Sequence, residues 1–309
     1  MTQPDGTRLL SEETVRLPDG RLAQLSVGGD PRGPAVFFLH GCPDTRRAAW
    51  SGHAVAERLG LRLIAVNRPG YGLSTAHDSG HLTVADDVAV VADLLGVAGF
   101  AVLGMSVGGP YALACAARHP DRVTAAAIVS APGMAVAMRP PVHRDDLSDD
   151  QVAFFRRLAG VSAVEGMGLV RPEFERYVAQ LDPGDPDEDA LARRWLEGLP
   201  PPDAALMASL PASDVAASLR ESLAQLEGYL RDAVVTFRGW PFDVADVRCP
   251  VSLWYGDLDA NAPPRNGIWL AERIGGATLS VREQTSHLGA LLLQWEPILT
   301  MLRRASSRS

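Results

Sequence analysis

The stretch from Phe100 to Pro120, FAVLGMSVGGPYALACAARHP, constrains the possible folds more than any other part of the chain. Its first part, Phe100–Gly104, is a continuous apolar run typical of a buried strand, and Val107–His119 has the pattern of a helix. A glycine-rich turn between a strand and a helix can bind phosphates through backbone amides, or it can thrust one side chain, Ser106, into a reaction. The remainder of the sequence decides between these two uses.

Composition and spacing argue against the phosphate-binding use. All 29 basic residues are arginine, so the chain has no lysine for a P-loop or for a Schiff base to pyridoxal phosphate. The turn GMSVGG lacks the G-x-G-x-x-G spacing and lies too late in the chain for a dinucleotide site. The acidic run from Asp182 to Asp189 lacks the spaced ligands of an EF-hand, so a solvated loop is expected there. We therefore expect no metal and no cofactor.

The distribution of apolar runs predicts an α/β fold. Helical patterns separate several runs, and alternating strands and helices imply a parallel sheet with right-handed crossovers. The turn Pro18-Asp19-Gly20, flanked by two short alternating runs, predicts an antiparallel hairpin before the parallel part. Besides Phe100–Gly104, the expected strands of the parallel part are Ala35–His40, Leu61–Asn67, Val123–Ser130, Cys249–Gly256 and Ala277–Glu283.

The segment 133–237 interrupts this alternation. It contains no convincing strand but has amphipathic helical patterns, among them Gln151–Leu158 and Val215–Leu230, separated by proline-rich and acidic loops. We therefore predict an α/β core formed by residues 1–132 and 238–309, with residues 133–237 as a helical insertion of the size of a lid.

Gly104-Met105-Ser106-Val107-Gly108 fits the pattern G-x-S-x-G of a nucleophile elbow. A serine in such a tight turn has strained backbone dihedrals. The positions two residues before and after it must lack bulk, which Gly104 and Gly108 provide. The helix that follows directs its first amides towards the site, so the N–H of Val107 can meet a developing oxyanion. The alternative for this pentapeptide alone is a structural glycine-serine turn.

A serine nucleophile needs a base and an orienting acid. Among seven histidines, His287 follows the last predicted strand and opens the final helix, predicted from about Leu288 to Arg304. The preceding strand ends in SLWYGDLDANAPP, which offers Asp259, our preferred acid, and Asp257 as the alternative. For His287 the competing interpretation is a helix-capping or surface histidine.

The second oxyanion donor is expected in the loop after the third strand, His40-Gly41-Cys42-Pro43. Glycine allows a close backbone approach, and the amide of Cys42 is the candidate because Pro43 has no N–H. The Cys42 thiol is the less favoured nucleophile, since no histidine-acid pair is assigned to it.

With these residues assembled, the sequence resembles the α/β-hydrolase superfamily. The motifs that carry the resemblance span positions 40 to 290 in the family's order: HGCP, NRPGYGLS, GMSVGGPYALA, YGDLDANAP and SHLGAL. The resemblance implies a mostly parallel, roughly eight-stranded sheet flanked by helices, with residues 133–237 as an inserted helical cap. One departure is Asn67, where many relatives carry an acid.

The resemblance also implies roles for single residues. Ser106 would be the nucleophile, His287 the base and Asp259 the acid, and the amides of Cys42 and Val107 would form the oxyanion hole. A serine nucleophile disfavours the haloalkane dehalogenase and epoxide hydrolase branches, which use aspartate at that position.

We therefore predict a serine hydrolase that cleaves a small or medium ester, lactone or related acyl compound. The alternatives are C–C bond hydrolysis, acyl transfer, amide or peptide cleavage on the same scaffold, or a ligand-binding receptor with low turnover. The expected partner is a small-molecule acyl substrate. The net charge of −8 argues against nucleic acid, and no run of roughly 18 apolar residues predicts a membrane span. Widely spaced cysteines and an amino terminus without an apolar core favour a cytoplasmic protein, expected as a monomer or homodimer.

Overall fold

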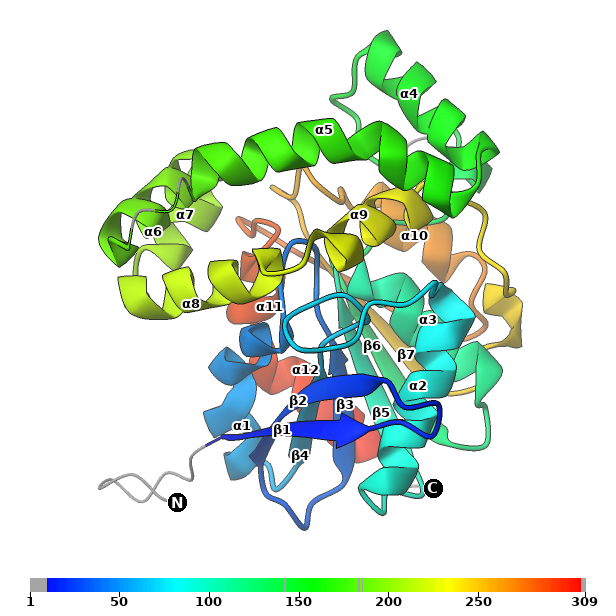
Figure 1. Cartoon of the computed structure of the whole chain (residues 1–309). Coiled ribbons are helices and arrows are strands. Elements are labelled where there is room, and N and C mark those ends of the chain that lie inside the picture. The colour runs from blue at the N-terminus through cyan, green and yellow to red at the C-terminus, as the bar shows by residue number, and fades with distance from the viewer. Residues whose placement is uncertain (1–9, 142, 183, 185, 307–309) are drawn as a thin grey trace.

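The core of the structure is one eight-stranded sheet (Figure 1). The computed structural model describes residues 10–141, 143–182, 184 and 186–306. The sheet has the order β1-β2-β4-β3-β5-β6-β7-β8. Both pairings of β2 are antiparallel and all other pairings are parallel, which confirms the predicted mostly parallel sheet. The strands are β1 (Ser11–Arg16), β2 (Leu22–Gly29), β3 (Ala35–Leu39), β4 (Arg62–Val66), β5 (Phe100–Met105), β6 (Val123–Val129), β7 (Val251–Gly256) and β8 (Thr278–Arg282).

The hairpin predicted from Pro18-Asp19-Gly20 is present between β1 and β2. Arg16 lies opposite Leu22 in the register, and Gly20 has a φ of 90°. A positive φ is readily adopted only by glycine, so this residue allows the chain to reverse.

Helices cover both faces of the sheet, and alternate side chains of β3 show how. Val36 and Phe38 join a buried cluster with residues of α1 and α12, whereas Phe37 and Leu39 join another cluster with residues of α2 and α3. Full burial of a phenylalanine contributes roughly 1.5–3 kcal/mol. The flanking helices are α1 (His53–Arg58), α2 (His81–Leu94), α3 (Gly108–Arg118), α10 (Arg265–Ala271), α11 (Gly289–Leu292) and α12 (Trp295–Ser306), with the 3₁₀ turns η1 (Arg46–Gly52) and η3 (Val244–Asp246). The single last helix of the prediction is two helices, α11 and α12.

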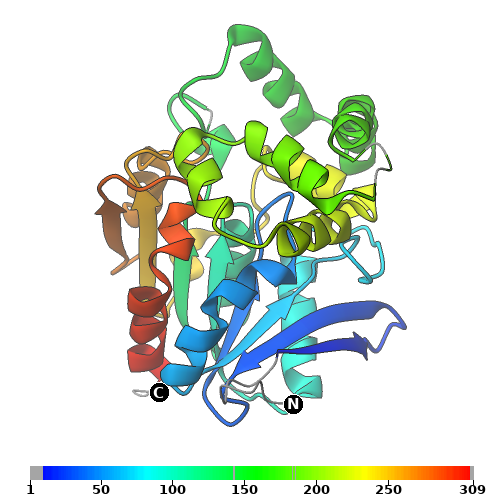
Figure 2. The same ribbon diagram turned by 90° about the vertical axis from the view of Figure 1, so that its left-hand side faces the viewer.

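Between β6 and β7, the described residues of the segment 133–237 form helices and no strand. These helices lie together at one end of the sheet, with α5 crossing farther from the strands than α8 and α9 (Figures 1 and 2). We call this segment the insertion. Its elements are η2 (Ala135–Ala137), α4 (Asp149–Gly160), α5 (Ala163–Leu181), α6 (Glu188–Glu197), α7 (Pro201–Met207), α8 (Ala212–Leu223) and α9 (Leu226–Val235).

The predicted single helix Val215–Leu230 is wrong, because α8 and α9 are separate. Gln225 has extended backbone dihedrals, φ −131° and ψ 127°, and its side-chain amide donates a hydrogen bond to the carbonyl of Gly72, 2.5 Å away. The chain therefore leaves the helical path where the insertion meets the core.

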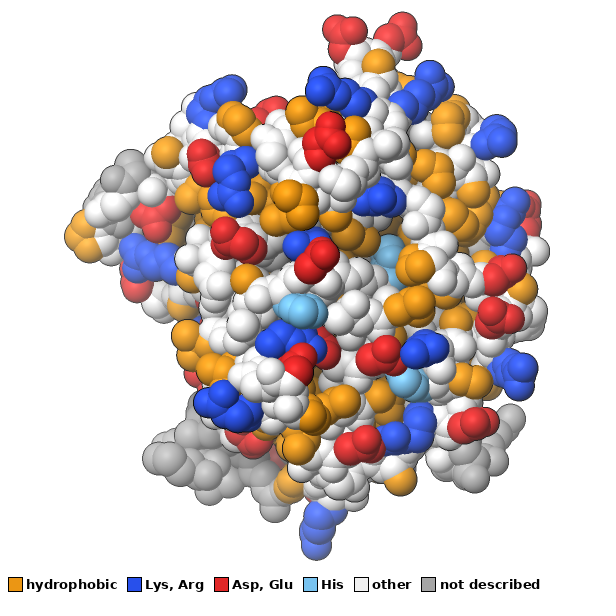
Figure 3. Space-filling model, turned by 45° about the vertical axis from the view of Figure 1, so that its right-hand side comes forward, with side chains coloured by type: hydrophobic (Ala, Val, Ile, Leu, Met, Phe, Trp, Pro, Cys, Tyr) orange, Lys and Arg blue, Asp and Glu red, His pale blue; other side chains and the backbone are white. Residues whose placement is uncertain are grey.

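No helix within the described residues is both long enough and apolar enough to cross a membrane. The face drawn in Figure 3 carries basic and acidic side chains that alternate over the surface, with apolar side chains between them.

Candidate active site

Ser106 lies directly after β5 in a turn with the expected strain. Its φ is 52°, in the left-handed region that non-glycine residues rarely adopt. Two backbone hydrogen bonds fix the turn: the N–H of Ser106 donates to Val129 O at 2.8 Å, and the N–H of Gly109 donates to Ser106 O at 2.8 Å. The first bond holds the serine at the carboxyl end of β6, next to β5 in the sheet.

The glycines on either side of Ser106 are required by close backbone packing. A Cβ atom on Gly104 would lie 2.4 Å from Gly108 O, and one on Gly108 would lie 2.1 Å from Leu39 O. Both distances are too short for any side chain. Val107 is the N-terminal cap of α3, and the first amides of a helix have no partner within it.

His287 and Asp259 are brought together by hydrogen bonds. His287 Nδ1 lies 3.0 Å from Asp259 Oδ1 and 2.9 Å from Oδ2. Oδ1 also accepts hydrogen bonds from the amides of Asn261, at 2.9 Å, and Ala262, at 2.8 Å. The carboxylate is therefore fixed by its own loop before it orients the imidazole.

Asp257, the alternative acid, has a different position. It is exposed, and its Oδ1 accepts a hydrogen bond from the N–H of Thr285 at 3.1 Å. This contact links the loop after β7 to the loop after β8, on which His287 lies. The structure therefore gives the contact with His287 to Asp259.

The surroundings of His287 favour its protonated form. Burial lowers the pKa of the imidazole. The charge and hydrogen bonds of Asp259, together with the charge of Asp203, raise this pKa by more than burial lowers it. Arg144 acts in the opposite direction. The net result is a pKa above the ordinary value for histidine.

The loop after β3 lies against Ser106. A Cβ atom on Gly41 would be 3.4 Å from Ser106 Cβ. The carbonyl of Gly41 accepts hydrogen bonds from Arg68 at 2.9 Å and from His40 Nδ1 at 2.8 Å. Because the C=O and N–H of one trans peptide point in opposite directions, these bonds direct the N–H of Cys42 away from Arg68.

Arg68 is held in turn by the insertion. Its guanidinium forms a buried ion pair with Asp232 of α9, with exposed side-chain fractions of 2% and 3%. The hydroxyls of Tyr71 and Tyr111 donate to the same carboxylate at 2.7 and 2.8 Å. The sequence motif NRPGYGLS contains Arg68 and Tyr71, but nothing in the sequence indicated Asp232 or its role.

The Cys42 thiol is not set up as a nucleophile. Burial raises its pKa far above the ordinary value, and the charge of Asp232 adds to this effect. The thiolate is the reactive form of cysteine, so the thiol stays protonated. Its neighbour is the Tyr71 hydroxyl, 3.5 Å from Sγ.

Comparison with known proteins identifies the family. A model of the alpha/beta hydrolase fold family matches residues 34–164. A pimeloyl-acyl-carrier-protein methyl ester esterase of Chromobacterium violaceum is 32% identical over 83% of this chain and 88% of its own length. The chain belongs to the α/β hydrolase fold family. A bifunctional esterase/perhydrolase of Acinetobacter calcoaceticus is 38% identical over 32% of this chain and 37% of its own length.

Solved structures agree with this α/β hydrolase fold. A bromoperoxidase from Bacillus anthracis superposes with a TM-score of 0.68 at 17% identity, covering 95% of this chain and 100% of that one. At this identity the likeness concerns the fold alone.

In this α/β hydrolase, Asn67 is hydrogen-bonded to a carboxylate from the insertion. Asn67 donates its side-chain amide to Gln24 Oε1 and to Glu221 Oε1, both at 2.9 Å. Glu221 belongs to α8, and its Oε2 also pairs with Arg46 at 3.0 Å and Arg47 at 2.7 Å. The insertion therefore supplies the carboxylate that meets position 67.

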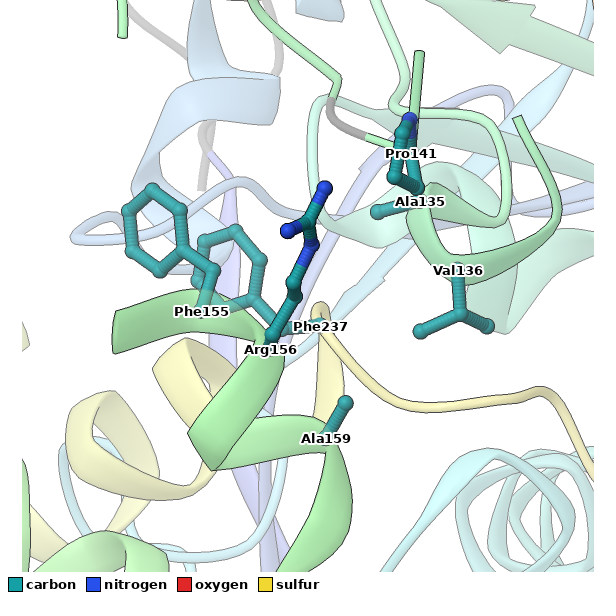
Figure 4. Close-up of a pocket in the computed structure, with 7 residues that line it drawn as sticks. All are labelled: Ala135, Val136, Pro141, Phe155, Arg156, Ala159 and Phe237. Carbon is teal, nitrogen blue, oxygen red and sulfur yellow. The ribbon is translucent and has the colours of Figure 1, made fainter. Parts of the chain in front are cut away.

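The α/β hydrolase also has a pocket of about 210 Å³ between η2 and α4 (Figure 4). Arg156 extends from α4 between Phe155 on one side and Pro141 on the other (Figure 4). The other lining residues are apolar: Ala135, Val136, Ala159 and Phe237. The pocket thus combines an apolar wall with one guanidinium.

Proposed function

We propose that this α/β hydrolase cleaves carboxylic esters, with Ser106 as nucleophile, His287 as general base and Asp259 as the orienting acid. The observation that carries the proposal is the pair of hydrogen bonds that the carboxylate of Asp259 accepts from His287 Nδ1. A carboxylate at Nδ1 fixes the tautomer whose Nε2 can accept a proton from a serine hydroxyl.

The reaction would proceed in two displacements. His287 Nε2 takes the proton of Ser106 Oγ while Oγ attacks the ester carbonyl carbon, and the imidazolium then gives this proton to the leaving alcohol. Water attacks the acyl-enzyme in the same way, losing a proton to His287, and the acid product leaves as Ser106 recovers its proton. Asp259 stays ionised and stabilises the imidazolium in both displacements.

The amides of Cys42 and Val107 would bind the developing oxyanion. The orientation of the Gly41–Cys42 peptide, fixed by Arg68 and His40, supports the first donor. The place of Val107 at the start of α3 supports the second. Each such donor contributes on the order of 3 kcal/mol to the transition state.

The relatives support an ester as the substrate. The two curated relatives described above are named as esterases, the first of them as a pimeloyl-acyl-carrier-protein methyl ester esterase. We therefore propose a small-molecule ester with a small or medium acyl chain as the substrate. The insertion, residues 133–237, would act as the lid that selects it.

Labelling with a fluorophosphonate probe tests the nucleophile. We expect covalent modification of the wild-type protein at Ser106 and none of Ser106→Ala. With p-nitrophenyl esters of increasing chain length, Ser106→Ala and His287→Ala should each lower kcat by on the order of 10⁴–10⁶. If the probe does not react although a small acyl compound raises the melting temperature, a binding protein replaces the enzyme as the explanation.

Paired substitutions test the acid. Asp259→Asn should lower kcat by about 10⁴, because the amide favours the wrong tautomer of His287. Asp257→Asn serves as the matched control, since it lies on the same loop without touching the imidazole, and we expect it to remain within a few fold of wild type. The reverse order of effects would transfer the role of the acid to Asp257.

A further inference from the structure

A second buried carboxylate lies next to the segment that carries His287. Asp203 belongs to α7 of the insertion and is only 2% exposed. Its Oδ1 accepts a hydrogen bond from the N–H of Leu288 at 2.9 Å. Leu288 directly follows His287, so this bond fixes the peptide between the candidate base and the next residue.

Packing brings α7 to the same place. A Cβ atom on Gly289, the first residue of α11, would lie 3.4 Å from Leu206 Cδ1. Leu206 is one turn after Asp203 on α7. The close packing of α7 on α11 and the hydrogen bond therefore act together, and they join the insertion to the residues directly after His287.

A buried carboxylate is unfavourable unless hydrogen bonds or opposite charges offset it. Asp203 has the Leu288 amide as a hydrogen-bond donor, and it forms no ion pair with any arginine in the part of the chain that the structure describes. A positive charge that appears nearby during turnover would offset it further. The imidazolium of His287 is such a charge.

The groups that act on His287 come from several elements. Asp259 and Asp203 both favour its protonated form, and Arg144 opposes them. His143, on the segment before α4, is affected by His287 in turn, because a charge on His287 lowers the pKa of His143. Asp203 is therefore one of two carboxylates whose charge favours the imidazolium.

We propose that Asp203 is a positioning residue for His287: its carboxylate holds the Leu288 N–H in place, and its charge stabilises the imidazolium that forms as Ser106 is deprotonated. The proposal rests on the proposed function for its effect on turnover, but the effect on the imidazole itself is independent of any substrate. It makes the insertion a part of the catalytic apparatus in addition to a cover for it.

Two substitutions separate the two roles of Asp203. Asp203→Asn keeps an oxygen acceptor for the Leu288 N–H but removes the charge. We expect the titration of the His287 imidazole, followed by NMR with ¹⁵N-labelled histidine, to move to lower pH. The acidic limb of kcat/KM for p-nitrophenyl acetate should move in the same direction. Asp203→Ala also removes the acceptor, and its kcat should fall by about tenfold or more because a buried N–H is left without a partner.

Glu221→Gln provides the matched control, since Glu221 is another acid of the insertion with little exposure, 11% of its side chain, and its carboxylate contacts Asn67, Arg46 and Arg47. We expect it to leave the His287 titration unchanged. The proposal is overturned if Asp203→Asn lowers the melting temperature as Glu221→Gln does but moves neither the NMR titration nor the acidic limb. Should Asp203→Asn fail to fold, Asp203→Ser replaces it, because a hydroxyl can still accept from the Leu288 N–H.

The NMR titration also separates this proposal from the proposed function. A shifted His287 titration in a protein that cleaves no ester would support the positioning role and contradict the esterase. Normal ester cleavage with an unshifted His287 titration would support the esterase and contradict the positioning role of Asp203.

Discussion

The two parts of the insertion are attached to the rest of the protein in different ways. Helices α7, α8 and α9 each send one buried or largely buried acid to a loop of the core: Asp203 to the His287 segment, Glu221 to the arginines of η1, and Asp232 to Arg68. Helices α4 and α5 instead pack on α9 through apolar side chains, including Leu158, Val170 and Val234.

The ion pairs of α5 agree with this contrast. Within the described residues they join Arg171 to Glu175 and to Glu227, both inside the insertion. The segment from α7 to α9 is therefore tied to the loops that carry the candidate catalytic groups, while α4 and α5 rest on α9. Of these two helices, α4 lines the pocket with Arg156. The two parts of the insertion therefore differ in their attachment: polar contacts join α7 to α9 to the core, and apolar packing joins α4 and α5 to α9.

The largest expected effect on the stability of the fold follows from removing the carboxylate of Asp232. Asp232→Ala leaves Arg68 buried without a counter-charge and takes the acceptor from two tyrosine hydroxyls. We expect a loss of about 3–5 kcal/mol in the free energy of unfolding, measured in denaturant. The double variant Arg68→Met with Asp232→Leu should recover part of this stability but not the esterase activity, since the Gly41 carbonyl then keeps His40 and loses Arg68 as a donor. A loss below about 1 kcal/mol for Asp232→Ala would contradict the anchoring role.

A smaller effect is expected from placing an acid at position 67. Asn67→Asp removes both donated hydrogen bonds and brings a second carboxylate to Glu221 Oε1, so we expect a loss of about 1–3 kcal/mol at neutral pH. Like charges raise the pKa of one carboxylate in the folded state, so the loss should shrink as the pH falls through that value. Glu221→Gln in the same chain should remove the pH dependence. A pH-independent loss would show that repulsion is not its cause.

Replacing a glycine by alanine should change the stability in opposite directions in the two parts of the insertion. On α9, a Cβ atom at Gly228 would lie 2.5 Å from the ring of Tyr71 and 2.7 Å from Gly70 O, so Gly228→Ala should destabilise by about 1–3 kcal/mol. On α5, exposed Gly168 has no atom within 4 Å of that position, so Gly168→Ala should stabilise by about 0.5–1 kcal/mol. Thermal unfolding measures both, and equal effects would remove the contrast between α9 and α5.

The smallest effect concerns two histidines. Burial, with the charges of Arg144 and Arg265, lowers the pKa of His143 to about 4, and its ring packs against Phe237. The pKa of His287 is raised. As the pH falls from neutral towards 5, the folded state binds a proton at His287 more readily than the unfolded state, which increases the free energy of unfolding. At His143 the unfolded state binds the proton more readily, which decreases it. NMR titration, assigned with His143→Gln, should find His287 titrating above His143, and the reverse order would refute the assigned environments.

Much of the core could be predicted from the sequence. Continuous apolar runs located the strands to within about two residues, because strands covered on both faces need apolar residues at every position. The glycines around Ser106 and the pair Asp259 and His287 lie in short motifs at strand ends, so local sequence was enough to find them. Their catalytic roles remain predictions that the substitutions above test.

The contacts of the insertion could not be predicted in the same way. Asp203 and Asp232 lie in amphipathic helices, where an acid usually marks the solvent face, and their partners are 85 and 164 positions away. No proline or glycine at Gln225 indicates the break between α8 and α9. The break coincides with a tertiary hydrogen bond from the Gln225 side chain to Gly72. Such features are determined by tertiary contacts, which no local pattern encodes.

The distance in sequence between Arg68 and Asp232 also bears on how the protein is made. At roughly 5–20 residues per second, a ribosome takes about ten to thirty seconds to add the 164 positions between them. Throughout that time the nascent chain contains the loop at Gly41, and in its later part also the nucleophile turn, but not the carboxylate that holds Arg68. Arg68 is therefore expected to remain without its counter-charge until α9 has emerged and docked, while Asp259 and His287 are added to the chain later still.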